Sequence, residues 1–74
     1  MGPKYRNMDP VFTQGGVGII SSVIAKKKFY GNVNDIPQYS INDVYYYMIS
    51  DFRGLSIEVE EQSIIGKLTF EPNK

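Results

Sequence analysis

The segment from Ser40 to Gly54 carries a clear helical period. Five apolar residues recur at spacings of three and four, namely Ile41, Val44, Tyr45, Met48 and Phe52. This spacing places them on one stripe of an α-helix. Ser40 and Asp43 have the spacing of a capping box, and Gly54 stands where a left-handed residue commonly ends a helix. The pattern predicts an amphipathic helix at about residues 41–53, with the Asn- and Asp-rich residues 32–35 in the loop before it.

Beyond Gly54 the apolar period changes from that of a helix to that of a strand. Apolar and polar residues alternate over residues 55–59 and again over residues 64–70. This alternation predicts two half-buried strands that a short turn joins into a hairpin. In such a hairpin Glu58 and Lys67 would face each other on the outer side as a cross-strand ion pair.

The apolar segment from Val17 to Tyr30 fits two interpretations. As a strand it follows a glycine turn at Gly15 and Gly16, and its many β-branched residues suit a pleated surface. As a helix it would end on three lysines, which favour the negative end of the helix dipole, and would stop at Gly31. The strand is preferred because β-branched residues carry a helix-propensity cost, and the helix stays an open alternative.

These elements together predict an α+β domain with the order ββαββ. A short strand at residues 11–13 would begin it, and four antiparallel strands would form one sheet with the helix packed on one face. The domain is expected to span residues 10–72, and residues 1–9 are expected to form a flexible N-terminal segment. The helix stripe and the inner face of the sheet would share a single core.

Composition narrows the possible chemistry. The 74 residues include no Cys and no His, so the chain lacks a thiol nucleophile, an imidazole base and the usual zinc ligands. The glycines of residues 15–18 do not have the spacing of a phosphate-binding or dinucleotide-binding loop. We therefore expect no enzymatic activity, no catalytic residue, no cofactor and no metal site.

The apolar and charged residues also bear on location and partners. The apolar run from Val17 to Ala25 is about half of the ~20 residues that a membrane-spanning helix needs. We expect no membrane span, and a cytoplasmic location because the lack of Cys fits a reducing compartment. Residues 1–34 contain five basic residues and one acidic residue, whereas residues 35–74 contain three basic and seven acidic ones. Such halves can attract each other within one fold, attract between copies, or present a basic and an acidic face to different partners. The simpler alternative is that the charges only solvate a mixed surface.

The lysines at positions 26–28 precede Phe29 and Tyr30, and this combination is typical of single-strand nucleic-acid binding. On a strand, Lys26, Lys28 and Tyr30 would share one exposed face. Three lysines neutralise few phosphates, however, and the acidic second half of the chain would repel a polyanion. Weak binding of single-stranded nucleic acid through Lys26, Lys28 and Tyr30 is therefore an alternative function, beside a simpler role in protecting an edge strand from unwanted pairing.

Protein binding is the favoured function. On the predicted helix Tyr46 and Tyr47 fall outside the apolar stripe, and Arg53 lies two turns from Tyr46 with Ile49 nearby. Tyr and Arg are enriched at the hot spots of interfaces. Ile65 is a further apolar residue without a place in the predicted core. We expect a non-enzymatic inhibitor, adaptor or structural subunit that binds another protein, or a second copy of itself, through these five residues and an exposed sheet edge.

Overall fold

The computed structural model describes residues 2–69, and its regular structure in that range is a single antiparallel sheet with one 3-10 turn and no α-helix. The elements are β1 (Pro10–Thr13), β2 (Gly16–Val33), β3 (Ile36–Ser50), β4 (Ser56–Glu60), the 3-10 turn η1 (Glu61–Ser63) and β5 (Gly66–Lys67). The order of the strands across the sheet is β4-β3-β2-β1-β5. The protein is therefore all-β, and the predicted α+β class with its ββαββ order is wrong.

The predicted helix at residues 41–53 does not form. Strand β3 runs through most of this segment and pairs with β2 from Ser50, opposite Ile19, to Ile36, opposite Val33. Residues 44–49 are all apolar or aromatic, so they satisfy a helical stripe and also supply apolar side chains to both faces of a strand. Consecutive tyrosines favour the strand. Gly54 has a φ of 85° in the turn between β3 and β4, where it ends no helix.

The preferred strand interpretation of residues 17–30 is confirmed, because they lie within β2. The glycine turn before them is confirmed as well. Strands β1 and β2 pair from Thr13, opposite Gly16, to Pro10, opposite Ile19. Gly16 has a φ of 118°, a conformation that side-chain-bearing residues rarely adopt, so a glycine suits this turn.

The predicted C-terminal hairpin is wrong. Strand β4 pairs with β3, whereas the two residues of β5 pair with β1 at the opposite edge of the sheet. Glu58 and Lys67 consequently have other partners. The Lys26 Nζ atom lies 3.0 Å from a carboxylate oxygen of Glu58, and the Lys67 Nζ atom lies 3.4 Å from one of Asp9. The end of the predicted second strand, at Phe70, lies outside the described residues.

The sheet curves around a small core. Six residues are buried in it, namely Tyr5, Val11, Ile20, Tyr47, Ile49 and Ile64. The ring of Tyr5 meets the ring of Tyr47 edge to face, with 5.6 Å between the ring centroids. The segment before β1 thus contributes an aromatic side chain to the core.

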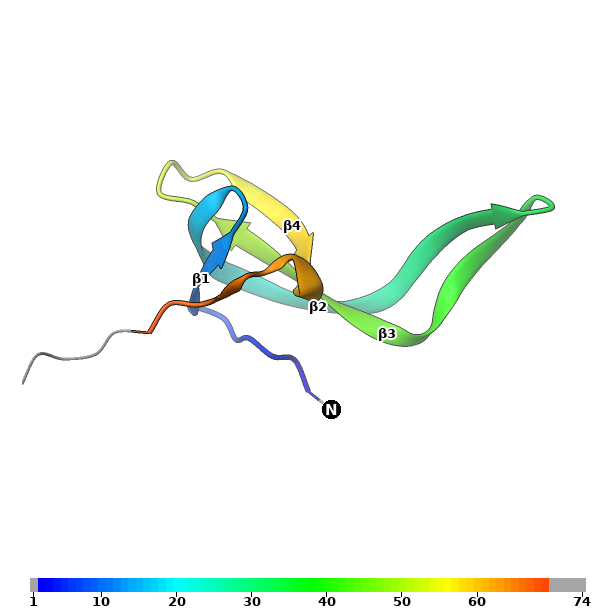
Figure 1. Cartoon of the computed structure of the whole chain (residues 1–74), viewed down its shortest axis with the longest axis horizontal. Coiled ribbons are helices and arrows are strands. Elements are labelled where there is room, and N and C mark those ends of the chain that lie inside the picture. Colours follow the sequence, from blue (N-terminus) through cyan, green and yellow to red (C-terminus); the bar gives the residue numbers. More distant parts are fainter. Residues whose placement is uncertain (1, 70–74) are drawn as a thin grey trace, which may run out of the picture.

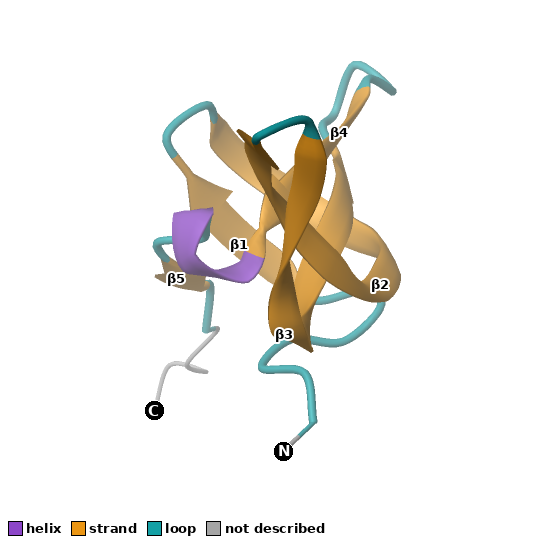
Figure 2. Cartoon of the chain, turned by 90° about the vertical axis from the view of Figure 1, so that its right-hand side faces the viewer, coloured by secondary structure: helices purple, strands orange, loops and turns teal. Residues whose placement is uncertain are grey.

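Strands β2 and β3 extend far beyond their neighbours. Strand β1 pairs with β2 no further than Ile19, and β4 pairs with β3 only from Tyr46 to Ser50. Residues 27–43, which we call the hairpin arm, therefore pair only with each other. The arm projects from the body of the sheet (Figure 1). Figure 2 views the molecule along the arm, towards the curved sheet.

Candidate protein-interaction surface

The hairpin arm is closed by a tight turn. Asn34 and Asp35 have φ values of 51° and 64°, and they connect the paired residues Val33 and Ile36. When both central residues of a two-residue turn are left-handed, the twist of the turn matches that of the two strands it joins. Asn and Asp tolerate the left-handed region well. Further along the arm the pairing shifts on both sides of Phe29, and Gly31 has a φ of 111° beside the second shift. The shifts bend the arm.

The arm exposes its large apolar side chains. Six of them are more than half exposed, namely Phe29 (53%), Tyr30 (66%), Val33 (58%), Ile36 (61%), Tyr39 (57%) and Ile41 (90%). A two-stranded ribbon has no second layer to cover such side chains. This concentration of apolar surface on a thin projection is typical of a binding surface.

Both faces of the arm carry apolar groups. Val33 and Ile36 form a cross-strand pair and so share one face, and side chains alternate along β3 from Ile36 to Tyr39. Tyr39 therefore points to the opposite face, together with its partner Phe29. The centroids of the Phe29 and Tyr39 rings are 5.4 Å apart. A partner would have to enclose the arm to cover all of this surface.

The three lysines near the base of the arm are engaged within the chain. The ammonium group of Lys26 pairs with Glu58, that of Lys27 with Asp43 and that of Lys28 with Glu60. The hydrogen bond to Glu60 raises the pKa of Lys28. The oppositely charged halves of the chain thus meet inside one molecule. A phosphate at this site would compete with three carboxylates.

The predicted nucleic-acid residues lie close together on the sheet. The partners of Lys26 and Lys28 are alternate residues of β4, so both lysines lie on one face of the sheet, as expected for a strand. The Lys26 ammonium lies 4.7 Å from the ring centroid of Tyr46, and that of Lys28 lies 5.6 Å from that of Tyr30. These cations already contact aromatic rings and carboxylates.

The five residues predicted to bind a protein do not form one surface. Tyr47 and Ile49 are buried in the core, and Tyr46, as the neighbour of Tyr47 on a strand, lies half-buried on the opposite face. Arg53 is exposed in the turn between β3 and β4, where its guanidinium group pairs with Asp51. Ile65 is 69% exposed and lies beyond η1.

Ile65 lines a groove between the free edge of β4 and the turn that joins β1 to β2. The groove has a volume of about 440 Å³, and its lining is uncharged, consisting of Thr13, Gln14, Gly15, Ile57, Val59, Gln62, Ser63 and Ile65. A second hollow of about 180 Å³ adjoins it at Ile57 and Gly15 and is lined partly by Val17 and Ile49. The two hollows form one continuous surface beside β4.

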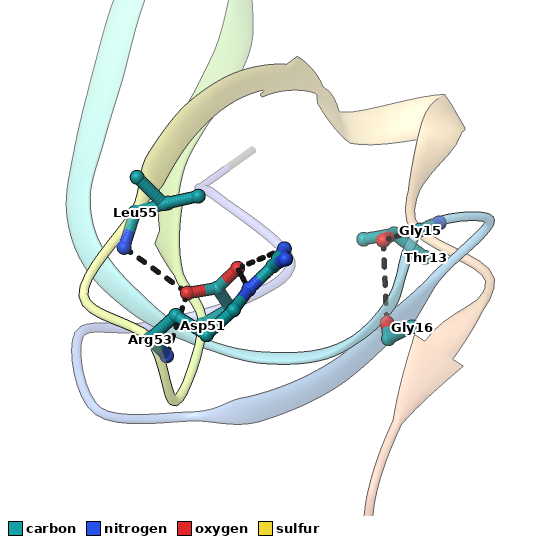
Figure 3. Close-up of polar contacts among 6 residues, drawn as sticks. All are labelled: Thr13, Gly15, Gly16, Asp51, Arg53 and Leu55. Atoms are coloured by element: carbon teal, nitrogen blue, oxygen red, sulfur yellow. Dashed lines mark hydrogen bonds and ion pairs between the residues drawn. The ribbon is translucent and has the colours of Figure 1, made fainter.

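Polar contacts hold the two turns that border the smaller hollow (Figure 3). Thr13 Oγ1 accepts the N–H of Gly15 and donates to the carbonyl oxygen of Gly16, both at 3.2 Å. Across the hollow, Asp51 accepts the backbone N–H groups of Arg53 and Leu55 at 2.9 and 3.0 Å. Burial raises the pKa of Asp51, but these hydrogen bonds and the Arg53 side chain outweigh it and lower the pKa below its usual value.

A buried hydroxyl ties the N-terminal segment to the sheet. The Tyr47 hydroxyl donates to a carboxylate oxygen of Glu61 at 2.6 Å, and it accepts the backbone N–H groups of Lys4 and Tyr5 at 3.1 and 3.3 Å. Burial and the hydrogen bond to Glu61 raise the pKa of Tyr47 to about 12. These contacts give Tyr47 a structural role.

Residues 27–43 form a projecting hairpin with exposed apolar side chains, which sequence reasoning missed. Their signal was the pair Asn34–Asp35 between apolar residues, which is typical of a tight hairpin turn but was assigned to a loop before a helix. Across residues 2–69, no cluster of Asp and Glu side chains is suitable for holding a metal ion, and no helix is long and apolar enough to cross a membrane. Comparisons of the chain with protein-family models, curated proteins and solved structures found no match.

Proposed function

We propose that this protein is a non-enzymatic interaction module that binds a protein partner, or a second copy of itself, through its hairpin arm. The observation that carries the proposal is the exposure of six large apolar side chains on both faces of a two-stranded ribbon. Water contact with this much apolar surface is unfavourable, and a partner that covers it gains the corresponding free energy.

The size of the exposed surface supports the proposal. Taking about 180 Å² as the mean for a fully exposed large side chain, the exposed fractions of the six residues correspond to roughly 700 Å². A typical stable protein interface buries about 800 Å² on each partner. The arm alone therefore supplies nearly the whole contribution of one partner.

The ion pairs at the base of the arm favour a protein over a nucleic acid as the partner. Each of the three lysines has a carboxylate within 4 Å, and the rest of the arm carries one further charge, on Asp35. Nucleic-acid affinity depends on cations that are free to neutralise phosphates. Apolar contact, in contrast, needs no such cation.

Site-specific photocrosslinking tests the proposal. A benzophenone amino acid replaces Tyr39 in the arm, and the matched control carries it at Asn7, which is exposed on the body of the protein. Each chain is irradiated in an extract of its source cells, and the products are treated with protease or nuclease. We expect protease-sensitive adducts from position 39 that are absent from position 7. Equal adducts at both positions, or adducts that only nuclease removes, would contradict the proposal.

A further inference from the structure

We propose that the hairpin arm of one copy occupies the groove beside β4 of a second copy, so that the chain assembles head to tail. This inference rests on the proposed function and names the occupant of its binding surface. The arm points away from the body that contains the groove (Figure 1). An arm can therefore reach the groove of a neighbouring molecule while its own groove stays open.

The groove offers a strand a place to pair. Strand β4 is at the edge of the sheet and hydrogen-bonds to β3 on one side only. Its other edge is paired with no strand of the described residues, so its backbone donors and acceptors can take an added strand. Ile57 and Val59 of β4 line the groove, and Ile65 faces them from beyond η1. A strand inserted here meets backbone groups along one side and apolar side chains around it.

The arm and the groove match in their chemistry. Charged residues make up 22% of the chain, yet residues 29–42 contain one charge, on Asp35, and the larger part of the groove has none. The main cost of burying a charge is the removal of its water. Contact between these two nearly uncharged surfaces avoids this cost.

The geometry sets the symmetry of the assembly. Arm and groove are different surfaces, so contact between them is heterologous, and each bound copy still presents a free arm or a free groove. Such contacts close into a ring or continue as an open chain. Because the contact is apolar and nearly uncharged, its strength should change less than twofold between about 0.1 and 0.5 M NaCl. Over this range added salt screens surface charges progressively, so a contact that depends on ion pairs would weaken.

Sedimentation velocity of the purified full chain over a wide concentration range tests the inference. Ile41→Asp places a charge on the arm, Ile65→Asp places one in the groove, and Met8→Asp is the matched control at an exposed apolar residue outside both surfaces. All three side chains are at least 69% exposed, so the fold should persist, which circular dichroism checks. We expect the wild type and Met8→Asp to associate, and each of the other two variants to associate at least tenfold more weakly.

Mixing the two defective variants gives the decisive result. The Ile41→Asp chain retains an intact groove and the Ile65→Asp chain an intact arm, so head-to-tail contact predicts a one-to-one complex in the mixture. Wild-type-like association of Ile65→Asp alone would indicate arm-to-arm contact and overturn the inference, as would a mixture that stays monomeric. A monomeric wild type whose arm crosslinks to another protein would overturn the inference and leave the proposed function intact, whereas a monomer without arm-specific adducts would overturn both.

Discussion

Gly18 lies where the curved sheet leaves no room for a side chain. It pairs with Val11 and faces the core, and a Cβ atom built on it would lie 2.3 Å from Cγ2 of Ile49 and 3.1 Å from the carbonyl oxygen of Ser50. Ile49 is itself buried, and the second atom belongs to the backbone of β3. Gly18→Ala must therefore push β2 away from β3 or displace Ile49 within the core.

The expected cost follows from two opposed effects. Overpacking a core by a methyl group costs typically about 1–3 kcal/mol. Replacing glycine by alanine also lowers the conformational entropy of the unfolded chain, which stabilises the fold by about 0.4–1 kcal/mol. We expect a net loss of about 1–2 kcal/mol in the free energy of unfolding. That is a large share of the roughly 4–11 kcal/mol expected for a domain of 74 residues.

Urea denaturation followed by circular dichroism measures this loss, and Gly66→Ala is the matched control. A Cβ atom at Gly66 has no neighbouring atom within 4 Å, and its φ is not in the left-handed region, so this variant should stay within about 0.5 kcal/mol of the wild type. In an Ile49→Ala background the closest clash is gone, and Gly18→Ala should cost less than it does alone. Equal stabilities of Gly18→Ala and Gly66→Ala would refute the close packing of β2 on β3.

Two titrating groups give further predictions. The Tyr47 hydroxyl has a pKa of about 12 in the fold and about 10 when unfolded, so the free energy of unfolding should fall by about 2 kcal/mol as the pH rises from 10 to 12. Urea curves over this range should show a smaller fall for Tyr47→Phe, and an equal fall would contradict the burial of the hydroxyl together with its hydrogen bond to Glu61. The lowered pKa of Asp51 gives stability that is present above its usual value of 3.8 and is lost as the pH falls further. Thermal unfolding between pH 2 and 5 should be less dependent on pH in Asp51→Asn, and an unchanged dependence would count against its role in the turn.

The sequence pattern correctly predicted the elements whose conformation is set by their own residues. The glycine turn between β1 and β2 needs a residue with positive φ, and the β-branched residues of β2 favour a strand in any context. The strand at residues 56–60 also follows from simple alternation. In these segments the sequence period and the tertiary contacts agree.

Long-range pairing decides the segments that were predicted wrongly. Residues 44–49 are all apolar or aromatic, so their pattern fits a helix and a strand equally well. Their pairing with the long strand β2 decides that they form a strand. Strand β5 pairs with β1 because η1 redirects the chain after Glu60, and two residues of pairing leave almost no periodic signal. Such contacts join residues far apart in sequence, which a period along the chain does not record.

The same error hid the exposed apolar residues of the hairpin arm. Once residues 41–53 were assigned to a helix, Tyr46 and Tyr47 both fell outside its apolar stripe, on opposite flanks, and were expected to be exposed. A strand instead sends them to opposite faces, and Tyr47 enters the core. Residues 32–35 likewise changed from a connecting loop to the tip of a hairpin. The apolar residues around that tip are the most exposed apolar residues of the sheet, and they do not belong to a core.

The conformational entropy lost in ordering the hairpin arm is the strongest reason to expect a partner. Residues 27–43 make up nearly a quarter of the 74-residue chain, and none of them is buried. Ordering a residue costs about 1–2 kcal/mol of backbone entropy, and an isolated two-stranded hairpin is marginally stable in water. A chain this small barely assembles one core, so an arm of this length weakens the single molecule. Contacts with a partner would compensate for this loss of stability, and the exposed apolar residues on both faces of the arm are the groups that would make them.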